Sequence, residues 1–167
     1  MTSTREDRIT MSINTVAHLN FHGQARAALE FYHSVFGGQI TVTTYGDFGM
    51  PAELPGATKV VFGQVLADNG FRLMAYDVPG QDVPLAQGEG APTTRRENGV
   101  TLTEEPFFLS VRGETVEEVG ALWEQLAEGA TVVEAYAPAQ WAPAFGMLTD
   151  RFGITWILDV AAEYVQA

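Results

Sequence analysis

The chain has 167 residues, of which 46% are apolar, a formal net charge of -12 and no cysteine. A chain of this length can bury a core as one domain or as two small packed units. The missing cysteines exclude disulfides, thiol nucleophiles and thiolate metal sites, and the acidic charge disfavours binding to nucleic acid and to anionic membranes.

The sequence predicts neither a membrane-spanning helix nor a signal peptide in its first ten residues. No apolar run approaches the roughly 18–20 residues of a membrane-spanning helix, and the first ten residues lack the apolar segment of a signal peptide. We expect residues 1–12 to be a disordered leader and 161–167 a short tail. The absence of cysteine agrees with a cytoplasmic location.

The first half of the chain alternates between strand and helix patterns. A strand is predicted over 13–21, and a helix over 24–36 whose apolar residues recur at helical spacing before Gly37-Gly38 ends it. The dipeptide Asn69-Gly70 indicates a tight hairpin, because both residues tolerate positive φ. The three remaining strands of this half are predicted over 39–45, 59–67 and 71–77.

The second half repeats this order. Thr115 and Glu118 form a capping-box pattern, so a helix is predicted from there to about residue 128. The predicted strands are 106–112, 131–136, 145–149 and 154–160. We therefore expect one domain over 13–160, built of a βαβββ module at 13–78, a linker at 79–105 and a second module at 106–160.

Two loops interrupt the pattern. Residues 46–57 hold two prolines and three glycines, and residues 79–100 form a much longer segment between the halves. Loops longer than about 12–15 residues are usually lids or linkers. The longer loop is either a bare linker or a lid or dimer arm.

The two halves can be superimposed as sequence. An offset of 91 residues places the segment 31–45 on 122–136, with Tyr32 on Trp123. An offset of 82 places 65–78 on 147–160, with Asp68 on Asp150. Because a duplicated unit must bury its apolar face against its copy, we expect a pocket between the two modules.

Several short motifs resemble one family. They are Leu19-Asn20-Phe21, Ala28-Leu29-Glu30-Phe31-Tyr32, Val35-Phe36-Gly37-Gly38, Thr44-Tyr45-Gly46-Asp47, Leu73-Met74-Ala75 and the segment 145–153. The chain resembles the PhnB-like branch of the vicinal oxygen chelate superfamily, which includes glyoxalases, extradiol dioxygenases and bleomycin-resistance proteins. The resemblance implies an α+β fold in which two βαβββ modules form a curved eight-stranded mixed sheet around a cavity. It also implies a homodimer.

Superfamily enzymes hold a divalent metal on the first and last strand of each module. Carried over by spacing, these positions fall at Ala17, or His18 after a slip of one residue, and at Ala75, Phe108 and Ile157. Apolar side chains cannot bind a cation, which needs about three protein ligands. We therefore expect no metal. His18 is a weak candidate ligand should Zn, Ni, Mn or Fe bind.

Candidate pocket residues combine polar and aromatic side chains. In the first strand, Ala17, Leu19 and Phe21 share one face and His18 and Asn20 the other, and the sequence does not decide which face lines the pocket. Packing in the core, at an interface or at the surface would explain each candidate equally well. The full set is His18, Asn20, Tyr45, Met74, Tyr76, Phe108, Trp141 and Trp156.

Three functions stay open. The first is metal-free binding of a small apolar or aromatic molecule between the modules. The second is a metal-dependent lyase or dioxygenase whose ligands lie one residue away or come from a partner chain. The third is a structural or regulatory dimer with a filled cavity. Methyltransferase activity is not expected, because no glycine-rich strand–helix turn for a nucleotide cofactor is present.

Overall fold

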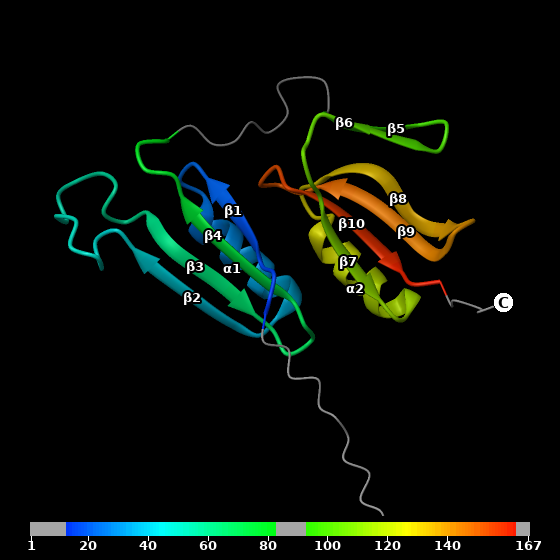
Figure 1. Ribbon diagram of the computed structural model, residues 1–167, viewed down its shortest axis with the longest axis horizontal. Coiled ribbons are helices and arrows are strands. Elements are labelled where there is room, and N and C mark those ends of the chain that lie inside the picture. Colours follow the sequence, from blue (N-terminus) through cyan, green and yellow to red (C-terminus); the bar gives the residue numbers. More distant parts are fainter. Residues whose placement is uncertain (1–12, 83–92, 163–167) are drawn as a thin grey trace, which may run out of the picture.

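A computed structural model describes residues 13–82 and 93–162 of the chain. Eight strands fall into two four-stranded mixed sheets that lie side by side, and each sheet carries one helix on the same side (Figure 1). This confirms the α+β class and the pair of βαβββ modules. Within the described residues no strand ladder joins the two sheets into one eight-stranded sheet.

Each module has the same strand order. The N-terminal sheet runs β1-β4-β3-β2 and the C-terminal sheet β7-β10-β9-β8, with β1 parallel to β4 and β7 parallel to β10. The N-terminal elements are β1 (Ala17–Phe21), α1 (Ala25–Phe36), β2 (Gln39–Thr44), β3 (Val60–Leu66) and β4 (Arg72–Asp77). The C-terminal elements are β7 (Leu109–Gly113), α2 (Val116–Leu126), β8 (Thr131–Ala139), β9 (Ala142–Thr149) and β10 (Thr155–Val160).

Most predicted boundaries agree with the structure to within three residues. The largest differences are at β1, which begins at Ala17 rather than at residue 13, and in the C-terminal sheet, where β7 begins later and β8 and β9 are longer than predicted. Residues 13–16 are apolar in part but pair with no strand. The predicted leader at 1–12 lies outside the described residues, as do 163–167 of the tail.

The linker between the modules contains a hairpin that the sequence prediction missed. Strands β5 (Thr94–Glu97) and β6 (Val100–Thr103) pair antiparallel, and the hairpin contacts β8 above the C-terminal sheet (Figure 1). The interpretation of 79–100 as a bare linker is therefore wrong for its described second part. Residues 83–92 lie outside the described part of the chain.

The turns explain this error. Asn69 does not adopt positive φ, and in that turn Gly70 alone does, at 96°. Asn98 and Gly99 instead have φ of 52° and 78°, the pair of positive values that a two-residue hairpin turn requires. The Asn-Gly turn with two positive φ values thus lies in the linker, where Glu97 pairs with Val100.

The repeat holds, but the strand offsets are each one residue larger than predicted. The Val78 amide donates to the Phe21 carbonyl, and the Ala161 amide donates to the Gly113 carbonyl in the same place of the second module. These bonds give offsets of 92 for the first strand and 83 for the last. The offset of 91 is right for the helices, where Ala28 and Val119 are equivalent and fully buried.

The two modules share one core. Buried side chains of α1, β1 and β4 form a cluster with those of α2, β9 and β10, and the two helices contact each other. In the described residues no helix is both long and apolar enough to span a membrane.

Candidate functional site: a pocket between the modules

A pocket of about 400 Å³ lies between the two modules. Its walls come from β1, the end of α1 and the start of β4 on one side, and from β7, α2 and β10 on the other. The main apolar lining residues are Phe36, Phe71, Leu73, Leu109, Leu122 and Trp156. This volume falls within the range of about 300–1,000 Å³ that is typical of small-molecule sites.

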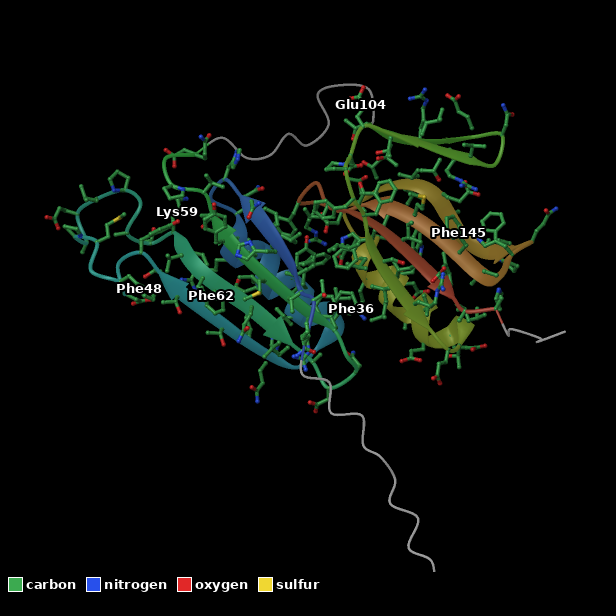
Figure 2. The ribbon with its side chains drawn as sticks, viewed as in Figure 1. Phe36, Phe48, Lys59, Phe62, Glu104 and Phe145 are labelled. Atoms are coloured by element: carbon green, nitrogen blue, oxygen red, sulfur yellow. The ribbon has the colours of Figure 1, made fainter. Side chains whose placement is uncertain are left out.

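Three stacked aromatic rings form one wall of the pocket. The rings of Phe36 and Phe71 are 3.7 Å apart and nearly parallel, at 4°. Trp156 stacks beside them, with ring centroids 5.7 Å from Phe36 and 6.3 Å from Phe71. Phe36 ends α1 where the two modules meet (Figure 2), Phe71 follows the β3–β4 turn, and Trp156 lies on β10. The wall therefore needs both modules.

Asp150 fixes the position of Trp156. Its Oδ2 accepts hydrogen bonds from Trp156 Nε1 at 2.8 Å and from the Tyr32 hydroxyl at 2.6 Å. Its Oδ1 accepts from the amides of Phe152 and Ile154. Tyr32 belongs to the other module, so this carboxylate both orients the pocket wall and joins the modules.

Burial shifts the pKa of both acidic groups in this cluster. Burial raises the pKa of the Asp150 carboxyl above its usual range, although its four hydrogen-bond donors act in the opposite direction. Burial and the nearby Asp150 raise the pKa of the Tyr32 hydroxyl well above its usual value, so Tyr32 stays a hydrogen-bond donor. Its hydrogen bonds make the cluster a structural support of the pocket.

Four predicted pocket residues gather elsewhere, on the face of the N-terminal sheet that points away from α1. They pair in register, His18 with Met74 and Asn20 with Tyr76. His18 Nδ1 lies 3.1 Å from Asn20 Oδ1, and its ring packs edge-on against Tyr76 at 5.3 Å. His18 and Asn20 are exposed, whereas Leu19 and Phe21 face the core, which decides the faces of the first strand.

The other four predicted residues are dispersed. Trp156 lines the pocket, as described above, and is 1% exposed. Tyr45 donates its hydroxyl to the Asp77 carbonyl at 2.7 Å, and Phe108 is half-buried just before β7. Trp141 is 54% exposed in the β8–β9 turn.

The corresponding face of the C-terminal sheet is covered by the β5–β6 hairpin. Met147 on this face is fully buried, and the Thr101 hydroxyl of the hairpin lies 3.7 Å from its sulfur. The Arg96 guanidinium lies over the rings of Trp141 and Phe145, 5.7 and 5.3 Å from their centroids. Phe145 is seen on β9 below the hairpin (Figure 2).

Glu105 fastens the base of this hairpin. Its carboxylate accepts hydrogen bonds from the hydroxyls of Thr94, on the hairpin, and Thr155, on β10. Within the module, Thr155 also bonds Thr149 at 2.8 Å. Because these polar contacts are internal, the hairpin is part of the C-terminal module rather than a free arm.

The residues present do not fit a divalent metal. The four positions inferred from the family lie on two different faces, since Ala17 and Ala75 face α1 whereas Ile157 pairs with Ser110 on the face away from α2. On the outward faces, His18 lies among Asn20, Met74 and Tyr76. In the described residues no group of three or more His, Asp or Glu side chains could hold an ion.

A family model confirms the resemblance. The model of the Glyoxalase/Bleomycin resistance protein/Dioxygenase superfamily matches residues 15–158. The chain belongs to this superfamily. Its solved structural neighbours include a protein described as PhnB, which shows a shared fold.

Relatives of the chain cover nearly its whole length. Protein YjdN of Escherichia coli is 22% identical over 147 residues, which is 87% of this chain and 94% of YjdN. The structure of protein PA1353 from Pseudomonas aeruginosa is 28% identical and covers 90% of this chain and 98% of its own, with a TM-score of 0.66.

A second solved structure adds support for the fold alone. It is described as a putative 3-demethylubiquinone-9 3-methyltransferase, PhnB protein, from Bacillus cereus. It is 20% identical, covers 89% of this chain and all of its own, and has a TM-score of 0.61. That description applies to the Bacillus protein.

Sequence reasoning missed two of the three aromatic wall residues. Phe36 ends a helix stripe and Phe71 starts a strand, so each resembled an ordinary core position. Only the stacking of the two rings in one wall of a pocket that both modules line sets them apart. The repeat did predict that the pocket would lie between the modules.

Proposed function

We propose that this superfamily member binds a small apolar or aromatic molecule in the pocket between its modules, without a metal ion. The observation that carries the proposal is the aromatic wall of Phe36, Phe71 and Trp156 beside a volume of about 400 Å³. Flat aromatic surfaces favour offset stacking with aromatic ligands, which contributes about 0.5–1.5 kcal/mol per ring pair beyond the buried area.

The wall is formed in the absence of a ligand. Trp156 is held by the buried Asp150, and Phe36 packs flat against Phe71. Preorganised side chains lose little conformational entropy on binding. The site therefore suits sequestration or carriage of a flat molecule, because its described lining is mainly apolar, with Glu118 as the one carboxylate and no histidine.

A fluorescent probe of neutral charge tests the proposal directly. N-phenyl naphthylamine should bind the chain with enhanced emission, and Leu122→Phe, which adds a ring to the pocket, should weaken its binding at least tenfold. Leu54→Phe is the matched control, because Leu54 is 48% exposed in the loop at 46–57, outside this pocket. Failure of the probe and of a panel of aromatic compounds to bind the folded wild-type chain would refute the proposal.

Metal analysis separates this function from a metal-dependent enzyme. Chain purified without chelator should contain well under one equivalent of Zn, Ni, Mn or Fe, and adding these ions should not raise its melting temperature. About one tightly bound ion per chain would overturn the metal-free assignment. His18→Ala would then show whether the exposed imidazole is one of its ligands.

A further inference from the structure

The rim of the pocket is more basic than the rest of the molecule. Arg72 on β4 and Arg112 on β7 line it from opposite modules, and Ser110 adds a hydroxyl donor. Glu118 on α2 is its one acidic lining residue among those described. The whole chain has 21 acidic and nine basic residues, so two of the nine border this single site.

The two arginines differ in their partners. Arg112 forms a bidentate ion pair with Asp159, with nitrogen–oxygen distances of 3.0 and 2.8 Å. Arg72 forms no ion pair with any residue in the described part of the chain. Arg72 follows Phe71 directly in sequence and is one of the residues that line the pocket. Arg72 is therefore the cation available to a ligand.

The other polar groups of the rim do not compete for this cation. Asn69 is engaged with its own turn, since its side-chain nitrogen donates to the Phe36 carbonyl and its oxygen accepts from the Phe71 amide. Glu118 lies on α2, and no ion pair joins it to Arg72 within the described residues. A ligand that presents a negative charge would meet donors rather than acceptors at the β4 side of the pocket.

Resting on the proposed function, we propose that the ligand is an aromatic compound that carries one anionic group, such as a carboxylate or a sulfonate. Its ring lies against Phe36, Phe71 and Trp156, and its anion pairs with Arg72. Guanidinium is planar and permanently charged, so it matches such an oxyanion with two parallel hydrogen bonds. The Ser110 hydroxyl can donate a further bond from the opposite module.

Two probes that differ by one sulfonate group test this inference. Anilinonaphthalene sulfonate has the ring system of N-phenyl naphthylamine plus one sulfonate. We expect the wild-type chain to bind the sulfonate more tightly, and Arg72→Gln to weaken the sulfonate about tenfold, which is the effect of losing one charge-assisted contact. The neutral probe should change less than twofold.

Arg95→Gln is the control, because it makes the same change of charge on the exposed hairpin, where Arg95 pairs with Glu97 at 2.7 Å. It should leave both affinities within a factor of two. Added sodium chloride should weaken the sulfonate and not the neutral probe. Near-ultraviolet circular dichroism of each variant verifies that the probes report on folded chain.

The outcomes separate this inference from the function on which it rests. If neither probe binds, the pocket proposal itself is refuted. A second outcome is that the neutral probe binds and Leu122→Phe blocks its binding, but Arg72→Gln weakens the two probes equally or not at all. This result would refute the anionic class of ligand and leave the pocket proposal intact. Selective loss of the sulfonate in Arg72→Gln supports both.

Discussion

The two modules share a backbone plan but divide its tasks differently. In α2 the first turn is capped locally, because the Thr115 hydroxyl accepts a hydrogen bond from the Glu118 amide at 3.2 Å. In α1 no side chain caps the helix from its own N-cap residue. Asp77, at the end of β4, accepts instead from the amides of Gly23 and Ala25. Both helices are thus capped, but by residues at different positions in the two modules.

The faces of the two sheets that point away from the helices also differ, in how far they are exposed. On the N-terminal sheet, His18 and Asn20 are exposed beside half-buried Met74 and Tyr76. On the C-terminal sheet, the hairpin buries Met147 completely. One module therefore keeps a free face while the linker covers the other. The comparison shows that the asymmetry of the molecule arises from side chains and from the linker, and not from strand order.

The largest effect is expected at the buried Asp150, whose equivalent position in the N-terminal module is Ala67. Asp150→Ala leaves the Tyr32 hydroxyl, the Trp156 ring nitrogen and two amides without their acceptor. We expect it to lower the free energy of unfolding in urea by about 3–5 kcal/mol. The control is Asp68→Ala, an exposed residue in the equivalent turn, which should change it by less than about 0.5 kcal/mol. Equal losses would contradict the structural alignment of the two turns.

A smaller difference is expected between the two helix caps. Asp77→Ala removes the acceptor of three amides, those of Gly23, Ala25 and Val60. We expect it to cost about 2–4 kcal/mol, because buried amides lose their partners. Thr115→Ala removes one cap bond and should cost about 1 kcal/mol. Urea unfolding of both variants measures the contrast, and a Thr115→Ala loss as large as that of Asp77→Ala would rule out the long-range cap.

The smallest effect concerns the two outward faces. Hydrogen peroxide should oxidise Met74 several-fold faster than Met147, because thioether oxidation follows exposure and the hairpin buries Met147. Arg96→Ala removes the contact of the hairpin with Trp141 and Phe145. It should therefore bring the oxidation rate of Met147 closer to that of Met74. Peptide mass spectrometry over time gives both rates. Equal rates in the wild-type chain would show that the hairpin does not shield its sheet.

The sequence was sufficient to predict the helices and strands of the two modules and their order, but not the β5–β6 hairpin between them. Periodicity placed both helices to within a few residues, and glycines marked their ends. The sequence did not decide which side chains of each strand face the helix. An error of one residue in the register moves every side chain of a strand to the other face of the sheet. That error put Asp68 opposite Asp150, whereas hydrogen bonds in the two turns match Ala67 with Asp150.

The candidate site was predictable in place but not in composition. Duplication indicated a pocket between the modules, and Trp156 was among its candidates. Phe36 and Phe71 were not, because only the packing of a helix end against a distant turn brings their rings to 3.7 Å. The hairpin was predictable in principle, since Asn98-Gly99 lies between two short runs of strand-forming residues, but the surrounding linker masked it.

The hydrogen bond between Tyr32 and Asp150 also shows how the two modules differ. The residue equivalent to Tyr32 in the C-terminal helix is Trp123, and the residue equivalent to Asp150 in the N-terminal turn is Ala67. A chain built from two N-terminal modules would bring Tyr32 against an alanine, and one built from two C-terminal modules would bring an indole against a buried carboxylate. The two modules are therefore not interchangeable at this contact.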